Sequence, residues 1–125
     1  MTAGPLSDRE WRVLDVLWSG PEEGMTLGPI HEALRPGTGW SRNTVHTYLT
    51  RMAAKGLIAV EGDAPPHSYR AAVTREACAA AEGRTLLERA YQGSAGKLVA
   101  AFVREHTLTP EEREELRALL DEMEV

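Results

Sequence analysis

The sequence predicts a mainly helical fold that contains one small β-hairpin. Three segments up to residue 56 carry apolar residues at helical spacing, two short runs of alternating character follow them, and the chain is helical in character again from Thr74 onward. Because 42% of the 125 residues are apolar, the chain is able to bury a core of its own. These observations predict one domain over residues 1–73 and a helical region over residues 74–125.

The first helix is predicted to begin directly after Ser7. Ser7 and Glu10 have the spacing of a capping box, in which the serine side chain and the glutamate side chain satisfy each other's backbone N–H groups. Leu6 and Trp11 fit the hydrophobic staple that accompanies this motif. Gly20, with the proline and glycine that follow it, ends the helix.

The second and third helices have their own start and stop signals. Thr26 is a candidate cap for the second helix, and Pro36, Gly37 and Gly39 together are expected to stop it. Ser41 is a good cap for the third helix, which ends at Gly56 and turns three apolar residues inward: Val45, Leu49 and Met52.

A change of period from 3.6 to two follows the third helix. Residues 57–61 and 67–73 read as strands, and residues 62–66, which contain two prolines, join them as a hairpin. Three helices followed by a hairpin, with a short glycine-bearing turn between the second and third helices, form the winged helix-turn-helix arrangement.

The region from Thr74 onward is predicted to mediate dimerisation. A helical break falls at residues 93–96, and Thr109 with Glu112 gives the last helix a capping box. Its helices are too few to enclose a core, so their apolar stripes are expected to bury themselves against a second copy of the chain. The candidate dimerisation residues are Leu87, Tyr91, Leu98, Phe102, Leu116, Leu119, Leu120 and Met123.

The charge is unevenly distributed along the chain. The net charge of −5 by itself argues against nucleic acid, but residues 1–73 hold 7 Lys/Arg and 8 Asp/Glu, whereas residues 74–125 hold 7 and 11. No acidic residue occurs from Ala33 to Val60, a stretch that contains Arg35, Arg42, Arg51 and Lys55. This local charge of +4 is the electrostatic footprint that a DNA-reading segment needs.

The outward face of the third helix is the strongest functional signal. Its side chains are able to donate to phosphates and to read base edges, since Asn suits adenine, Arg suits guanine, and Ser and Thr suit phosphates. The alternative is an ordinary solvated face, although such faces usually mix acids with bases. The predicted DNA-binding residues are Ser41, Arg42, Asn43, Thr44, His46, Thr47, Thr50 and Arg51, with Arg70 and His67 as candidate backbone contacts in the wing.

The sequence gives no support for an enzyme, a cofactor or a metal site. The one cysteine, Cys78, forms no intrachain disulfide and is expected to be a buried, reduced thiol. The four histidines are scattered without ligand spacing, and the glycine-containing break at residues 93–96 lacks the lysine of a nucleotide-binding loop. Without a signal peptide or a membrane span, the protein is expected to be cytoplasmic and not inserted in a membrane.

The sequence resembles the penicillinase and methicillin-resistance repressors, the BlaI/MecI type. The resemblance lies in the runs LSDREW at residues 6–11, WSRNTV at residues 40–45 and TRMAAKGLI at residues 50–58. It continues in YQGS at residues 91–94, LVAAFV at residues 98–103 and LTPEEREEL at residues 108–116. The order and spacing of these runs extend the resemblance from about Leu6 to Leu120.

The resemblance implies a homodimeric transcriptional repressor that binds a palindromic operator through its winged domains. It also implies release from DNA by cleavage within the dimerisation region, triggered by a membrane-bound metallopeptidase sensor. In the family the cut precedes a phenylalanine that follows asparagine. In this sequence Phe102 follows Ala101, so only the second residue of the pair is retained.

Two alternative functions remain open from the sequence. A small molecule that fits between the wing and the C-terminal helices would make the protein a ligand-gated repressor, but only Tyr91 and Phe102 supply aromatic lining after Tyr69. The winged domain is alternatively a protein-interaction module without a DNA role. Binding that is indifferent to salt would favour the second alternative, because neutralised phosphates release counterions.

Overall fold

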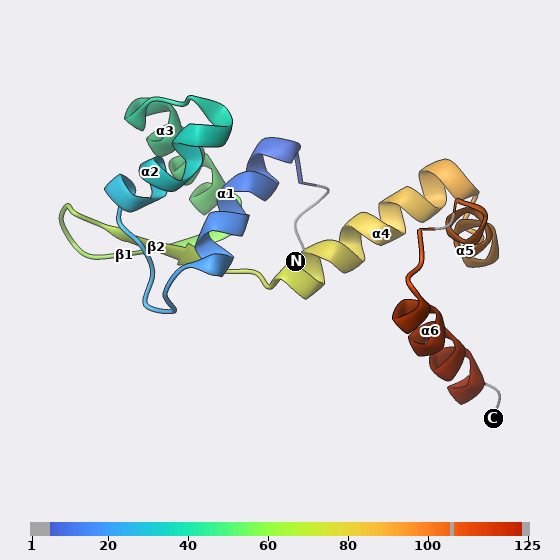
Figure 1. Cartoon of the computed structure of the whole chain (residues 1–125). Helices are drawn as coiled ribbons and strands as arrows, with labels where there is room; N and C mark the ends of the chain where they lie inside the picture. Colours follow the sequence, from blue (N-terminus) through green and yellow to red (C-terminus); the bar gives the residue numbers. More distant parts are fainter. Residues whose placement is uncertain (1–5, 106, 124–125) are drawn as a thin grey trace. The chain divides into compact units, whose positions relative to one another are not determined.

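The computed structural model describes residues 6–105 and 107–123, and it confirms the mainly helical fold with a single hairpin (Figure 1). Its contacts divide the chain into two units, Met1–Gly83 and Arg84–Val125. The first unit contains three helices, a two-stranded antiparallel sheet and the start of a fourth helix. These elements are α1 (Asp8–Ser19), α2 (Leu27–Thr38), α3 (Arg42–Ala54), β1 (Ile58–Glu61), β2 (Ser68–Ala71) and α4 (Arg75–Tyr91).

The predicted capping box starts α1. The Glu10 N–H donates to Ser7 Oγ over 3.2 Å, and the Ser7 N–H donates to Glu10 Oε1 over 2.9 Å. The second carboxylate oxygen of Glu10 accepts from Lys55 Nζ, 2.6 Å away at the end of α3. Although Glu10 is an acid, only 7% of its surface is exposed. One carboxylate therefore fixes both the first turn of α1 and the last turn of α3.

The second helix ends at the predicted stop signal, at Gly39, but its amino end differs from the prediction. Thr26 occupies the cap position of α2, but its side chain makes no capping hydrogen bond. Pro36 does not stop the helix, which continues to Thr38. A proline this close to a helix end removes a single hydrogen bond, and the Gly39 N–H closes the last turn on the Arg35 carbonyl over 2.8 Å. Gly39 adopts a φ of +69°, which glycine tolerates readily.

The hairpin is shorter than the two runs predicted at 57–61 and 67–73. Ile58 pairs with Ala71 at its open end and Glu61 pairs with Ser68 at the turn. Beyond this register the chain turns toward α1, where the Val73 carbonyl accepts a hydrogen bond from Trp18 Nε1 over 2.9 Å. One further backbone bond, from the Ala72 N–H to the Leu57 carbonyl over 2.8 Å, joins the two runs before this side-chain contact.

The core of the first unit lies between the three helices and the sheet. It contains the three residues of α3 that were predicted to face inward, and Tyr69 of β2 is 5% exposed. The buried apolar residues are Val13, Leu14, Leu17, Ile30, Leu34, Val45, Leu49, Met52, Leu57, Ile58, Tyr69 and Cys78. Every element of the first unit contributes to this core, so the position of α3 depends on all of them.

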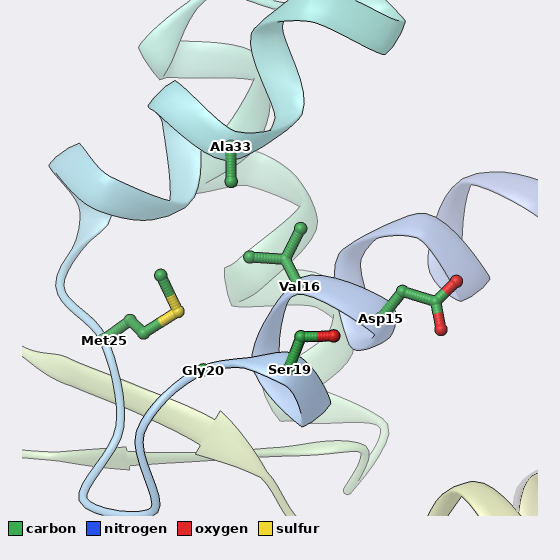
Figure 2. Close-up of a pocket in the computed structure, with 6 residues that line it drawn as sticks. All are labelled: Asp15, Val16, Ser19, Gly20, Met25 and Ala33. Carbon is green, nitrogen blue, oxygen red and sulfur yellow. The ribbon is translucent and has the colours of Figure 1, made fainter.

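A small hollow beside α1 and α2 is lined mostly by apolar side chains. Figure 2 shows Val16, Met25 and Ala33 directed into it, with Asp15 pointing away at its rim. A Cβ at Gly20 would lie 2.6 Å from Met25 Sδ, so a larger residue at this position would require the Met25 side chain to shift. We therefore interpret the hollow as a feature of the packing around the segment that connects α1 and α2.

The first turns of α4 pack on the first unit. Arg75 pairs with Asp15 over 2.8 Å, and its guanidinium lies 4.8 Å from the centre of the Trp18 ring. Cys78 is buried as expected, and its burial raises the pKa of its thiol. These contacts lie within the first unit, which extends to Gly83 and so includes the first turns of α4.

The second unit contains the rest of α4 together with α5 (Ala95–Arg104) and α6 (Pro110–Glu122). Ser94 caps α5, and the predicted capping box of Thr109 and Glu112 starts α6. None of the described residues in α5 and α6 is buried. Among the residues that the structure describes, no helix is both long and apolar enough to cross a membrane.

The Glu10 carboxylate provides a test of the fold through pH. Burial alone raises its pKa, but the hydrogen bond from Lys55, the backbone N–H of Ser7 and the charge of Lys55 outweigh burial and lower the pKa below its ordinary value of 4.5. The stabilisation is therefore complete above pH 4.5 and is lost as the pH falls through the lower folded-state pKa.

We expect Glu10→Gln to reduce the free energy of unfolding by about 1 to 2 kcal/mol at pH 7, because the charged hydrogen bond to Lys55 is lost. The loss is no larger because water still solvates the partly exposed ammonium of Lys55. Urea unfolding at pH 7 and at about pH 3 measures the effect, which should shrink at the lower pH. Glu22→Gln, in an exposed loop, is the control. Equal stability of the Glu10 variant and the parent at pH 7 would contradict this account.

Candidate nucleic-acid interface

The turn between α2 and α3 is held by side chains as well as by backbone. The Thr38 hydroxyl donates to the Leu34 carbonyl over 2.8 Å and accepts the Trp40 N–H over 3.1 Å. His31 Nε2 donates to the Trp40 carbonyl over 2.9 Å. The Trp40 ring stacks on Tyr48 of α3 with ring centres 4.7 Å apart. Sequence reasoning missed this arrangement, which fixes the angle at which α3 leaves the turn.

Ser41 caps α3 as predicted. Its Oγ accepts the Thr44 N–H over 3.1 Å and lies 3.1 Å from the Thr44 hydroxyl. Thr44 is half-buried and occupied by this contact, so its side chain is less available to a ligand than those around it. The Ser41 cap therefore fixes the amino end of α3, next to the exposed side chains of this helix.

The polar residues of α3 fall into two groups. Four of them point away from the core by the helical period and are exposed: Asn43, Thr47, Thr50 and Arg51. The Thr47 hydroxyl donates to the Asn43 carbonyl over 2.9 Å, which fixes its position. Arg42 and His46 are also exposed but lie on the flank of α3 that faces the wing turn. The sequence did not separate these two groups.

The cations of this stretch also differ in their contacts. Lys55 is held by Glu10, so it takes part in the fold. Arg35, Arg42 and Arg51 are exposed, and none of them is within ion-pair distance of a carboxylate in the part of the chain that the structure describes. The surface of α3 therefore keeps a positive charge even though the whole chain is acidic.

The wing presents its one arginine in an ion pair. Arg70 Nη2 lies 3.2 Å from Glu61 Oε2 on the neighbouring strand, and both side chains are substantially exposed. His67 Nδ1 hydrogen-bonds to the Gly62 carbonyl over 3.0 Å and closes the turn. The two wing residues that were predicted to contact DNA backbone are thus both engaged within the wing.

The predicted dimerisation residues lie in the second unit and remain accessible there. Leu87, Tyr91, Leu98 and Leu116 are half-buried. Phe102 is 43% exposed, and Leu119, Leu120 and Met123 are more exposed still. Val99 and Val103 of α5 are also exposed on the Phe102 side, and their spacing of four residues would have revealed them in the sequence.

The predicted cleavage position lies inside a helix. Ala101 is half-buried and Phe102 is exposed, and both are within α5. A protease needs an extended backbone, so cleavage here requires local unfolding of α5. Within residues 6–105 and 107–123, no group of three or more His, Cys, Asp or Glu residues is arranged to hold a metal ion.

The arrangement of the first unit is that of a winged helix protein. Two solved structures share this fold: the DNA-binding domain of the repressor BlaI, with a TM-score of 0.51 and 24% identity, and the monomeric form of Bacillus licheniformis BlaI in complex with a half-operator, with a TM-score of 0.50 and 21% identity. Each covers 60% of this chain, and the matches span 90% and 89% of those chains.

The whole length of the chain has relatives. The methicillin resistance regulatory protein MecI of Mammaliicoccus sciuri is 28% identical over 116 residues, which cover 93% of each protein. The penicillinase repressor of Bacillus licheniformis is 25% identical over 117 residues, covering 94% of this chain and 90% of that protein. The penicillinase repressor family profile matches residues 6–122. The chain therefore belongs to the penicillinase repressor family, a family of transcriptional repressors and not of enzymes.

The ion pair in the wing leads to a prediction about charge. Glu61→Gln releases Arg70 from its partner, and we expect binding to duplex DNA to tighten a few-fold because Arg70 becomes available to a phosphate. Fluorescence anisotropy at low salt measures the affinity. Asp63→Asn removes the same charge from the same wing without releasing Arg70, and it should have a smaller effect. Equal effects of the two variants would mean that only the net charge of the wing matters.

Proposed function

We propose that the protein is a cytoplasmic, homodimeric transcriptional repressor that binds palindromic operator DNA. The observation that carries this proposal is the exposed face of α3, which has no acidic residue and lies on a helix fixed at both ends. Membership of the penicillinase repressor family supports the same function. In this proposal the winged domain binds DNA and the C-terminal helices hold two chains together.

Recognition of DNA rests on α3. Asn43 and Arg51 are the residues suited to base edges, since an amide pairs with adenine and a guanidinium with guanine. Thr47 and Thr50 offer a hydroxyl to phosphate or a methyl group to thymine. Phosphate contacts from Arg42, together with the amino end of α3, would set the register of the helix in the major groove.

Dimerisation follows from the second unit. The apolar side chains of α5 and α6 have no core of their own among the described residues, and a second copy would cover them. Joining two weak half-site binders raises their effective concentration, and the gain in affinity can exceed roughly a hundredfold. A twofold dimer would place its two copies of α3 on half-sites about one helical turn of DNA apart.

Release from DNA would reverse this gain. Cleavage between Ala101 and Phe102 would divide α5 and split its apolar face, leaving Val99 with the winged domain and Phe102 with α6. A membrane-bound metallopeptidase sensor is the proposed trigger of that cleavage. The exposure of Phe102 supports this position, whereas the helical backbone requires that α5 open first.

The function is tested by selecting bound duplexes from a random-sequence library. We expect an inverted repeat to be enriched, and Arg51→Ala to weaken binding to the enriched duplex by about tenfold and to relax the preference at the base pair that Arg51 contacts. The side chain of Arg51 is exposed, so the midpoint of urea unfolding should not change. Full affinity of the variant would place the reading face elsewhere, and no enrichment at all would contradict DNA recognition.

The dimer is tested separately by changing its apolar face. Phe102→Gln should raise the dimer dissociation constant by at least about tenfold, because each chain loses the burial of an aromatic ring. Sedimentation equilibrium measures this constant. Arg104→Gln, on the opposite side of α5, is the matched control and should leave it unchanged. An unaltered dimer in the Phe102 variant would exclude this face as the interface.

A further inference from the structure

A hollow of about 290 Å³ lies between α3 and the turn of the wing. Arg42 and His46 stand on its α3 side, one helical turn apart. The described residues that line it include no acid, so the positive charge of Arg42 is not neutralised inside the hollow. Its chemistry on this side is suited to a small anion.

Most of the remaining lining of the hollow is apolar. Leu27 and Tyr69 form part of the lining, and the rings of Pro65 and Pro66 form another part. Tyr69 is held in place because its backbone N–H and carbonyl pair with Met25 over 2.8 and 2.9 Å. Proline rings have no freely rotating side chain to order when a ligand binds. The hollow is therefore preformed.

The ring of His67 completes the lining from the wing. Its Nδ1 is committed to the Gly62 carbonyl at 3.0 Å, which fixes the ring as a wall. Contacts to an anion therefore fall to Arg42, whose guanidinium matches the two oxygens of a carboxylate, and to His46, which offers an N–H in either tautomer. The size of the hollow is at the lower end of ligand pockets, which suits a molecule of one or two rings.

We propose that this hollow binds a small planar aromatic carboxylate, and that the bound ligand competes with DNA. The competition rests on the proposed function, because Arg42 and His46 belong to the surface assigned to DNA. An anion held there neutralises Arg42, engages the N–H of His46 and occupies the space between α3 and the wing. By linkage, DNA would weaken binding of the carboxylate by the same factor.

Binding is tested first without DNA, on the full chain, by following amide chemical shifts during titration with benzoate. We expect a submillimolar dissociation constant for benzoate and at least about tenfold weaker binding of benzamide, which has the same ring without the charge. Inorganic phosphate should also bind more weakly, since it gains nothing from the apolar walls. Equal binding of benzamide, tighter binding of phosphate or no binding of benzoate would each overturn the proposal.

Two arginine variants locate the site. Arg42→Gln should weaken benzoate binding by at least about tenfold with an unchanged urea midpoint, whereas Arg51→Gln removes the same charge from the far end of α3 and should retain the affinity within about twofold. Equal losses in the two variants would show that benzoate responds to general charge, which would overturn the site.

Competition is then measured by anisotropy on the duplex enriched from the random library. Benzoate at ten times its dissociation constant should weaken DNA binding by about tenfold. Benzoate binding that leaves DNA affinity unchanged would overturn the competition but not the function. Benzoate binding to a protein that recognises no DNA would contradict the proposed function and leave the ligand site in place.

Discussion

The surface of α3 depends on the carboxylate of Glu10. One of its oxygens completes the first turn of α1, and the other holds Lys55, 45 residues later, at the end of α3. A buried acid is costly unless charge and hydrogen bonds compensate it, and here both do so. This contact joins the first helix to the third and so holds the carboxyl end of α3 in place. The stacking of Trp40 on Tyr48 positions the amino end of α3.

The same contact separates structural charge from functional charge. Lys55 belongs to the basic stretch of the sequence, but its ammonium stabilises the fold. Arg42 and Arg51 stay exposed at opposite ends of α3, and the acids are concentrated elsewhere, above all in the C-terminal region. A protein with net charge −5 thus keeps a surface suited to phosphates, because the arrangement of charge decides what that surface attracts.

Local signals in the sequence predicted most of the fold. The caps at Ser7, Ser41 and Thr109 were predictable because each contact spans only three residues. Of the three predicted stop residues of α2, Gly39 ends the helix by closing the last turn on the Arg35 carbonyl, whereas the helix runs through Pro36. The Lys55 contact to Glu10 was beyond reach of the sequence alone, because no local pattern links residues 45 positions apart.

The candidate site was predicted as one set, and the structure divides it. Helical spacing identified the outward face of α3, but the wing turn, which gives Arg42 and His46 a different setting from Asn43 and Arg51, depends on tertiary packing. Likewise, the composition of the wing suggested that Arg70 was available, whereas cross-strand pairing brings Glu61 to it. The sequence shows which residues are polar. It does not show which of them already form hydrogen bonds or ion pairs within the protein.

In the proposed function, α3 is the element that enters the groove of DNA. Amide chemical shifts of the isotope-labelled protein, followed during titration with its selected duplex, test this most directly. We expect the largest changes at residues 42–51, with smaller ones in the wing turn and little change along α1. Changes concentrated on α1 or in the C-terminal helices, with those of residues 42–51 unmoved, would contradict it.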